Sequence, residues 1–398
     1  MYVKRMHLSI GPSLRPLKTP AAEVPHAVLE SNYTCNGRCT LCYNLTREIV
    51  KPLGQLESEL DAMCRLRRLE TVSILGGEPT LHPDLPAIVR LVKSRGVYCQ
   101  LLTNGIVLFR DGSDRLLDAL LQAGIDRIVL HVDSGQGFTA EESDLMCTTL
   151  FDKFERRGVF FAISWTLYRD NIGGIPALMR RSSRYRHFDG MLATLARPGS
   201  EMTQAAVPAF GRPDMADVDA VIRTGLGVEA SSYIPSSLDD EEIRWLMYLY
   251  YINASTGETV PLSPAFVRLM RRVYRLVAGR NMFAATARLS LSGALFAATV
   301  LVESLLSPRR LARFIGIASR PSSLHDIRFH SIIVQSVPDF NAARGCVEIC
   351  YHCPDATVRD GRLAPVCLAD HMSPPGPEGG LRGDEDLARA IHAHLETP

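Results

Sequence analysis

Short apolar runs alternate with longer amphipathic stretches through the first half of the chain. The apolar runs lack a clean alternation of apolar and polar residues, and they cover residues 27–33, 71–75, 98–103, 127–132, 159–165 and 190–196. The stretches between them carry apolar residues at helical spacing. Apolar strands joined by helices indicate a parallel sheet that is covered on its outer face. We therefore expect an α/β protein whose six strand–helix units form a partial (β/α)6 barrel, with ligands at the carboxyl ends of the strands.

The alternation ends near residue 200. Residues 202–240 are rich in proline, glycine, serine and aspartate, as connecting segments are. Residues 240–314 are predicted to be mainly helical, with separate elements at 241–252, 263–280 and 281–306. The expected organisation is an N-terminal extension (1–26), the barrel (27–200), a linker with a helical insert (201–343), and a C-terminal auxiliary segment with its tail (344–398).

Charge and composition narrow the range of partners. The 398-residue chain has 44 basic and 43 acidic residues, so no broad basic surface predicts a nucleic-acid partner. Its longest apolar stretch, 289–302, is interrupted by polar residues and falls short of the roughly 20 that span a bilayer, so we expect no transmembrane segment. The N-terminus also lacks the apolar run of a signal peptide. We expect a cytoplasmic protein whose ten cysteines are reduced and available as metal ligands or catalytic thiols.

Three cysteines follow the first predicted strand in one short loop: Cys35, Cys39 and Cys42. Thiolates are the ligands that iron–sulfur clusters require, and three of them can hold a 4Fe-4S cluster while leaving one iron open to a small molecule. Gly37 suits a tightly wound loop. A zinc site is the alternative, although a structural zinc site takes four protein ligands and only three are local here.

The spacing C-x3-C-x2-C after a first strand resembles that of the radical S-adenosylmethionine (SAM) superfamily. The resemblance implies that the open iron binds the amino and carboxylate groups of SAM. This chain departs from the family pattern at Leu41, where an aromatic residue commonly contacts the adenine. Tyr43, two places later, is the candidate substitute.

A second motif, Gly76-Gly77-Glu78-Pro79, ends the second predicted strand. On its own it is a common strand-to-helix turn. In the superfamily such a turn lies beside the cluster and binds the SAM amino group through backbone carbonyls and the glutamate. The chemistry is consistent, because glycines allow close approach and a carboxylate complements an ammonium group.

Polar residues also follow the third and fourth predicted strands. Asn104 follows the third, and Asp133 and Ser134 follow the fourth. By resemblance, Asp133 or Ser134 meets a ribose hydroxyl or the methionine carboxylate, whereas the alternative for each is a cap or turn residue. These residues complete the predicted cofactor site, and no catalytic residue is singled out.

Four further cysteines lie within 22 residues near the C-terminus: Cys346, Cys350, Cys353 and Cys367. We expect a second iron–sulfur cluster, with a zinc site as the alternative. The spacing of the last three resembles the second-cluster segment of the GTP cyclase of molybdopterin synthesis. Cys346 is a candidate fourth ligand, which would close the cluster and favour electron transfer. The three remaining cysteines, Cys64, Cys99 and Cys147, are expected to be buried and inert.

The resemblance predicts a radical SAM enzyme. Such an enzyme reductively cleaves SAM to a 5′-deoxyadenosyl radical, which abstracts hydrogen from a C–H bond of its substrate, here expected to be small or hydrophobic and part of a biosynthetic pathway. It would take electrons from flavodoxin or ferredoxin. The alternatives are a peptide-modifying enzyme, for which residues 1–26 leave little room for a leader-binding domain, and a non-catalytic zinc or iron–sulfur scaffold.

The predicted helical insert bears on the substrate. One face of 263–280 carries apolar residues at helical spacing: Phe266, Leu269, Val273, Leu276 and Val277. Such helices either bury a core of their own or line a pocket for a lipid-like substrate. The basic run at 309–313 would suit lipid headgroups and membrane association, or is a solvated helix end.

Overall fold

The computed structural model describes residues 10, 14–37, 39, 42, 44, 48–110, 112, 114–133, 136–196, 211, 213–279, 281, 293–306, 308–318, 326–336, 338–341 and 346–372. Its contacts divide the chain into two compact units. Unit 1 comprises Met1–Lys18, Phe154–Leu195 and Phe210–Ser336, and unit 2 comprises Thr19–Lys153, Ala196–Ala209 and Val337–Pro398. Each unit thus combines segments that are distant in sequence.

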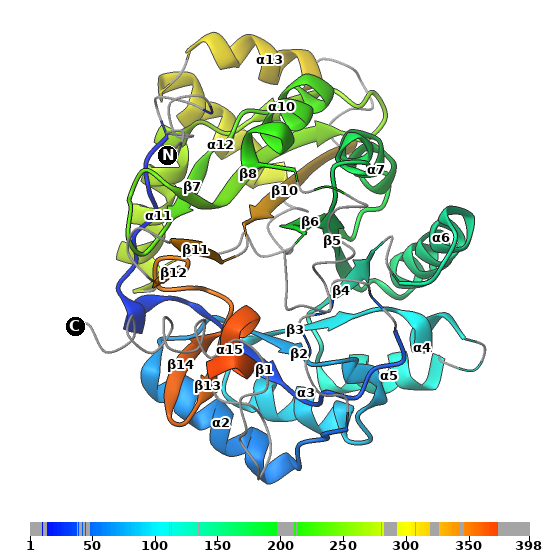
Figure 1. Ribbon diagram of the computed structural model, residues 1–398. Helices are drawn as coiled ribbons and strands as arrows, with labels where there is room; N and C mark the ends of the chain where they lie inside the picture. Colours follow the sequence, from blue (N-terminus) through cyan, green and yellow to red (C-terminus); the bar gives the residue numbers. More distant parts are fainter. Residues whose placement is uncertain are drawn as a thin grey trace. The chain divides into compact units, whose positions relative to one another are not determined.

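Unit 2 is built on four parallel strands in sequence order: β1 (His26–Glu30), β2 (Thr71–Leu75), β3 (Tyr98–Thr103) and β4 (Arg127–Val132) (Figure 1). The elements between these strands are α2 (Leu53–Leu66), η2 (Pro79–Leu81), α3 (Leu85–Ser94), α4 (Ile106–Phe109) and α5 (Asp114–Ala123), and η1 (Ala21–Glu23) precedes β1. Helix α6 (Ala140–Arg157) follows β4 and runs across the unit boundary. Helices α2 and α3 each bury one apolar stripe against the sheet, as amphipathic helices do.

The C-terminal segment of unit 2 adds two small hairpins and a helix. They are β11 (Asp339–Asn341) with β12 (Cys346–Glu348), β13 (Ala356–Arg359) with β14 (Arg362–Pro365), and α15 (Val366–Met372). Strand β13 contacts β1 and α2, and Val358 belongs to the same apolar core as the α2 and α3 side chains. The C-terminal cysteines are therefore carried by a segment that packs on the start of the sheet.

Unit 1 contains another group of paired strands. Its strands β5 (Phe160–Leu167), β6 (Phe188–Leu195) and β10 (Ile327–Gln335) are parallel, and β8 (Ile243–Asn253) runs antiparallel to β10. Strands β7 (Ser232–Pro235) and β9 (Thr259–Pro261) both pair with β8. The helical elements are η3 (Ile172–Gly174), α7 (Ile175–Ser182), α10 (Met215–Leu226), α11 (Pro264–Ala278), α12 (Gly293–Leu306) and α13 (Pro308–Ala318).

The predicted α/β class with a mainly parallel sheet is confirmed, and all six predicted strands are present as β1 to β6. The prediction of helix for 241–252 is wrong, because Ile243–Asn253 forms the long strand β8. This run is buried along nearly its whole length, so it has no amphipathic period, and its tryptophan, tyrosines and isoleucines favour a strand. The insert is therefore partly sheet, with helices only from residue 264 onward.

The apolar face of α11 is covered only at its beginning. Phe266 and Val267 are buried in a core with Tyr251 and Phe314, whereas Leu276 and Val277 are 85% and 83% exposed. The interpretation that these helices bury their own core thus holds for the first half of α11. Among the described residues, no helix is long and apolar enough to cross a membrane.

Candidate functional site

The three-cysteine loop leaves the carboxyl end of β1, and all three thiols are partly exposed. The backbone N–H of Gly37 donates to Cys35 Sγ at 3.3 Å. A Cβ placed on Gly37 would lie 3.5 Å from Cys35 Sγ and 3.9 Å from Cys39 Sγ, so both sulfurs lie close to this glycine. Leu41 and Tyr43, the candidates for the adenine contact, lie outside the described residues.

The Gly76-Gly77 turn packs directly on the chain that enters this loop. Gly77 N–H donates to Asn32 O at 2.7 Å, and Glu78 N–H donates to Thr34 O at 2.8 Å. A Cβ on Gly76 would lie 2.2 Å from Asn32 O, and one on Gly77 would lie 2.3 Å from Tyr33 O. Both positions therefore require glycine for contact with the cysteine-bearing segment, before any ligand is considered.

Glu78 is 1% exposed and lies between the ends of β2 and β3. Its Oε1 accepts hydrogen bonds from the Thr80 and Thr103 hydroxyls at 2.5 and 2.6 Å and from Thr80 N–H at 3.1 Å. Its Oε2 accepts from Asn104 N–H at 2.7 Å. Burial raises the pKa of Glu78, and these hydrogen bonds oppose that shift. The carboxylate thus holds the end of β3 in place, a role that the sequence did not indicate.

Asn104 extends from the end of β3 to the cysteine loop. Its Nδ2 donates to Asn36 Oδ1 at 2.8 Å and lies 3.9 Å from Cys35 Sγ. Its Oδ1 accepts from Ile106 N–H at 3.0 Å, which fixes the orientation of the amide. The predicted residue Asn104 thus lies beside Cys35, and Glu78 holds its backbone in that position.

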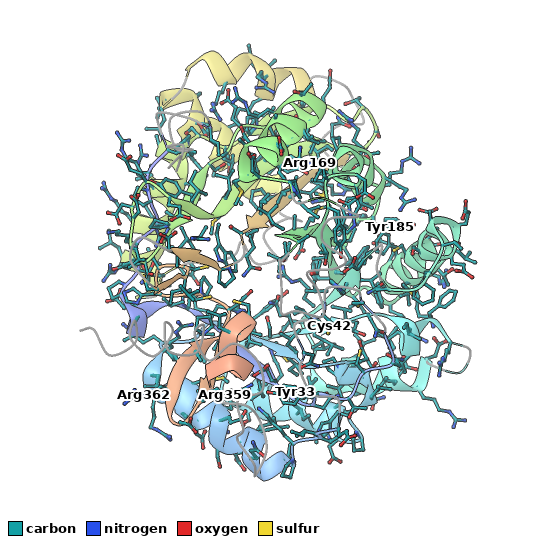
Figure 2. All side chains as sticks on the ribbon, viewed as in Figure 1. Tyr33, Cys42, Arg169, Tyr185, Arg359 and Arg362 are labelled. Atoms are coloured by element: carbon teal, nitrogen blue, oxygen red, sulfur yellow. The ribbon has the colours of Figure 1, made fainter. Side chains whose placement is uncertain are left out.

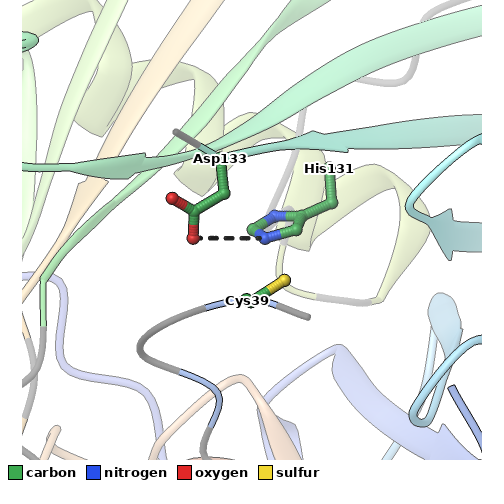
Figure 3. A group of neighbouring side chains, drawn as sticks. All are labelled: Cys39, His131 and Asp133. Atoms are coloured by element: carbon green, nitrogen blue, oxygen red, sulfur yellow. Dashed lines mark ion pairs between the residues drawn. The ribbon is translucent and has the colours of Figure 1, made fainter. Parts of the chain in front are cut away.

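The end of β4 also reaches the loop. Cys39, His131 and Asp133 each offer one donor atom, and these atoms all lie within 4.8 Å of one another (Figure 3). His131 Nε2 is 3.9 Å from Asp133 Oδ2. Sequence reasoning missed His131, although its position two residues before Asp133 places both side chains on one face of the strand. Ser134 lies outside the described residues.

Three of the C-terminal cysteines lie together. The pKa of Cys353 is raised by a hydrogen bond with the Cys350 side chain, by burial, and by the nearby thiols of Cys350 and Cys367. Cys350 and Cys353 are buried, and Cys367 is partly exposed on α15. Cys346 lies partly exposed on β12, four residues before Cys350. Elsewhere Cys99 and Cys147 are buried as expected, but Cys64 is exposed, because it faces outward from α2.

A buried arginine holds the Cys353 turn. Arg67, which is 4% exposed, donates to Cys353 O at 2.8 Å, Pro354 O at 3.2 Å and His26 O at 2.6 Å. Burial lowers its pKa to about 10. The guanidinium joins the end of α2, the start of β1 and the C-terminal cysteine segment.

A second buried arginine lies further along that segment. Arg359 Nη2 is 2.6 Å from Glu30 Oε2, and it also hydrogen-bonds the Tyr33 hydroxyl. Arg359 and Tyr33 are labelled among the side chains in Figure 2. The Tyr33 hydroxyl lies 3.4 Å from Glu30 Oε2, and Tyr33 is fully buried. No sequence signal identified these residues, because the contact joins positions 326 residues apart.

Comparison with known proteins agrees with the resemblance to the radical SAM superfamily. The family model of the radical SAM superfamily matches residues 29–143. A GTP 3′,8-cyclase of Chlorobaculum tepidum is 34% identical over 129 residues, which are 31% of this chain and 35% of that protein. A PqqA peptide cyclase of Methylorubrum populi is 28% identical over 181 residues, which are 41% of this chain and 45% of that protein.

The matched segments cover less than half of these relatives' length. Among solved structures, Streptococcus suis SuiB bound to S-adenosylmethionine aligns with a TM-score of 0.41 and 16% identity, over 53% of this chain and 47% of SuiB. The family match includes the cysteine loop, the Gly-Gly-Glu-Pro turn and the ends of β3 and β4. Residues 29–143 of this chain are therefore similar to the radical SAM superfamily.

Proposed function

We propose that this protein is a radical SAM enzyme that binds its cluster through Cys35, Cys39 and Cys42. When bound, a 4Fe-4S cluster supplies the electron that cleaves SAM to a 5′-deoxyadenosyl radical, which then abstracts hydrogen from a C–H bond of the substrate. The observation that supports this most is that residues from the ends of β1, β2, β3 and β4 meet at the cysteine loop.

The residues around the loop fit a cluster of this kind. Three thiols and no further cysteine lie in the described part of the loop, which matches a site with one open iron. Two N–H groups, from Gly37 and the Asn104 amide, point toward Cys35 Sγ. Such donors stabilise the added electron on a reduced cluster, because they partly neutralise the charge on its sulfur ligands.

The chain's own residues position SAM in two ways. Glu78 acts mainly through Asn104 and Thr103, since both of its oxygens already accept hydrogen bonds from the protein. Asp133 is 3% exposed and lies beside Cys39, so its carboxylate is placed to accept a hydrogen bond from a ribose hydroxyl or to meet an ammonium group.

The C-terminal cysteines are proposed to hold a second iron–sulfur cluster. Cys350, Cys353 and Cys367 form its centre, and Cys346 is the candidate fourth ligand. An external one-electron donor such as flavodoxin or ferredoxin would supply the reducing equivalent. The substrate is a small molecule or hydrophobic metabolite, and the relatives named PqqA peptide cyclase support a peptide as the second candidate.

The test is the formation of 5′-deoxyadenosine from SAM and dithionite by the anaerobically reconstituted protein. We expect the product from the wild type and from Cys64→Ala, whose thiol is exposed on α2 and remote in sequence from both cysteine groups. Cys39→Ala should give none, because the open-iron site needs all three thiolates. Product formation by Cys39→Ala, or a colourless zinc-loaded wild type, would overturn the proposal.

A further inference from the structure

A buried ion pair joins the two cysteine-bearing segments of unit 2. Glu30 is the last residue of β1, Arg359 is the last residue of β13, and their side chains are 3% and 9% exposed. The Arg359 guanidinium contacts both the Glu30 carboxylate and the Tyr33 hydroxyl, and it lies 6.0 Å from the centre of the Tyr33 ring. Desolvated charges are stable only in a narrow geometry, so these three side chains hold one another in register.

Tyr33 connects this ion pair to the first cysteine loop. Its backbone oxygen accepts from Asn44 Nδ2 at 3.2 Å, and a Cβ on Gly77 would lie 2.3 Å from the same oxygen. Cys35 is two residues further along the chain. There is no free space between Tyr33 and the Gly-Gly turn, so a shift of Tyr33 displaces both Gly77 and Cys35.

Arg359 itself lies in the C-terminal cysteine segment. The β13–β14 hairpin lies between Cys353 and Cys367 along the chain, and Arg67 fixes the turn that precedes it through Cys353 O and Pro354 O. A metal cluster that draws Cys350, Cys353 and Cys367 together therefore constrains the hairpin that carries Arg359.

We propose that Glu30, Tyr33 and Arg359 are positioning residues that couple occupancy of the C-terminal cysteine group to SAM binding at the first. This inference rests on the proposed function, because it assumes that SAM binds at the Cys35–Cys42 loop. The filled C-terminal site holds Arg359 against Tyr33 and keeps Gly77 and Cys35 in the SAM-binding arrangement. An empty C-terminal site relaxes this arrangement and weakens SAM binding.

The test measures SAM affinity by anaerobic equilibrium dialysis, together with iron content, on the reconstituted full chain. Arg359→Met should weaken SAM binding roughly 5- to 50-fold, the usual range for coupled sites, with iron at the first cysteine group retained. Arg359→Lys keeps the charge but lacks the planar guanidinium whose Nη2 contacts both Glu30 and Tyr33, so its SAM affinity should fall between those of Arg359→Met and the wild type. The matched control is Arg362→Met, an exposed position on the same hairpin, which should bind SAM as the wild type does.

Coupling is distinguished from mere local packing by a double-mutant cycle. Cys353→Ala should weaken SAM binding by itself, and adding Arg359→Met should weaken it little further, because both act through one linkage. If the two effects multiply, or if Arg359→Met binds SAM as the wild type does, the coupling is disproved. Should Arg359→Met fail to fold, Tyr33→Phe removes only the hydroxyl and carries the same expectations and the same contrary outcome.

The two proposals fail separately. If Cys39→Ala still yields 5′-deoxyadenosine, the proposed function is wrong and the coupling proposal is withdrawn with it. If Cys39→Ala is inactive as expected but Arg359→Met binds SAM with the affinity of the wild type, only the coupling proposal is wrong.

Discussion

At the scale of single residues, Glu78 illustrates how a buried carboxyl group can hold a strand end and the turn beside it in place. Burial raises the pKa of Glu78, and hydrogen bonds from Thr80, Thr103 and Asn104 act against that shift. The Glu78 carboxyl group contacts the strand end that presents Asn104 to Cys35. The Gly-Gly-Glu-Pro turn thus has a structural role that depends on no ligand.

Replacing Glu78 by glutamine tests this role. The amide keeps the shape but turns one acceptor into a donor that faces a hydroxyl or an N–H group, so we expect a loss of about 1–3 kcal/mol in the free energy of unfolding. Faster hydrogen exchange at the end of β3 would locate the effect. A variant as stable as the wild type, with unchanged exchange at β3, would contradict this account of Glu78.

The motif residues could be predicted from the sequence, whereas the residues that hold their segments in place could not. Cysteine spacing and the Gly-Gly-Glu-Pro turn are local signals, and they predict Cys35, Cys39 and Glu78 as site residues without the fold. Arg67 and Arg359 make their contacts across 286 and 326 residues, so no local pattern contains them. Only the folded chain brings such pairs together.

At the scale of elements, the turn after β2 and the segment after β1 act as one packed unit. Gly77 and Glu78 donate to Asn32 and Thr34, and Ser31 N–H donates to Leu75 O at 2.7 Å. The parallel pairing of β1 and β2 thus continues past the strands into the cysteine loop and the Gly-Gly-Glu-Pro turn. This continuation explains why two adjacent glycines occupy the turn.

Gly76→Ala should therefore disrupt the site through the backbone. Its new Cβ would lie 2.2 Å from Asn32 O, and we expect a destabilisation of about 3 kcal/mol, as for severe overpacking. Faster hydrogen exchange in residues 26–35 would report the displacement. The control is Gly54→Ala in α2, where a Cβ meets no atom within 4 Å and helix propensity should leave stability equal or up to about 1 kcal/mol higher. Equal effects of the two substitutions would argue against the packed turn.

Strand β8 shows the limit of periodicity as a signal. Its residues are buried on both faces, and a run without alternation does not distinguish a strand from a buried helix. Pairing with β10 on one edge and with β7 and β9 on the other determines its state, and those partners lie before and after it in sequence. The α11 helix, with polar and apolar faces and a Ser263 cap, was predictable because its signals are local.

At the scale of the whole molecule, each unit has a core of its own, so stability can be followed unit by unit. Both tryptophans, Trp165 on β5 and Trp245 on β8, belong to unit 1. Their fluorescence therefore reports the unfolding of unit 1. The same unit contains His330, which is fully buried on β10.

His330 should make unit 1 sensitive to acid. Burial, and then the charge of Arg328, lower its pKa to about 3. The unfolded chain binds a proton at His330 near pH 6.5, whereas the folded chain does not. The folded state is therefore not penalised by this histidine above pH 6.5, and it loses stability relative to the unfolded chain as the pH falls from 6.5 toward 3. Between pH 7 and pH 5 the loss from this residue should be about 2 kcal/mol.

Urea unfolding followed by tryptophan fluorescence at both pH values measures this loss. His330→Leu should be less sensitive to the change in pH than the wild type by the stated amount, whatever its stability at pH 7. Equal sensitivity of the two proteins would show that the histidine is accessible to protons in the folded state.

The central claim is that Cys35, Cys39 and Cys42 hold a cluster to which SAM binds directly. The most direct measurement is the EPR spectrum of the dithionite-reduced Cys353→Ala protein, with and without saturating SAM, so that the first cysteine group dominates the signal. We expect a 4Fe-4S signal whose g values shift when SAM is added and which disappears when Cys39→Ala is introduced as well. A signal that SAM leaves unchanged, or one that survives the loss of Cys39, would contradict it.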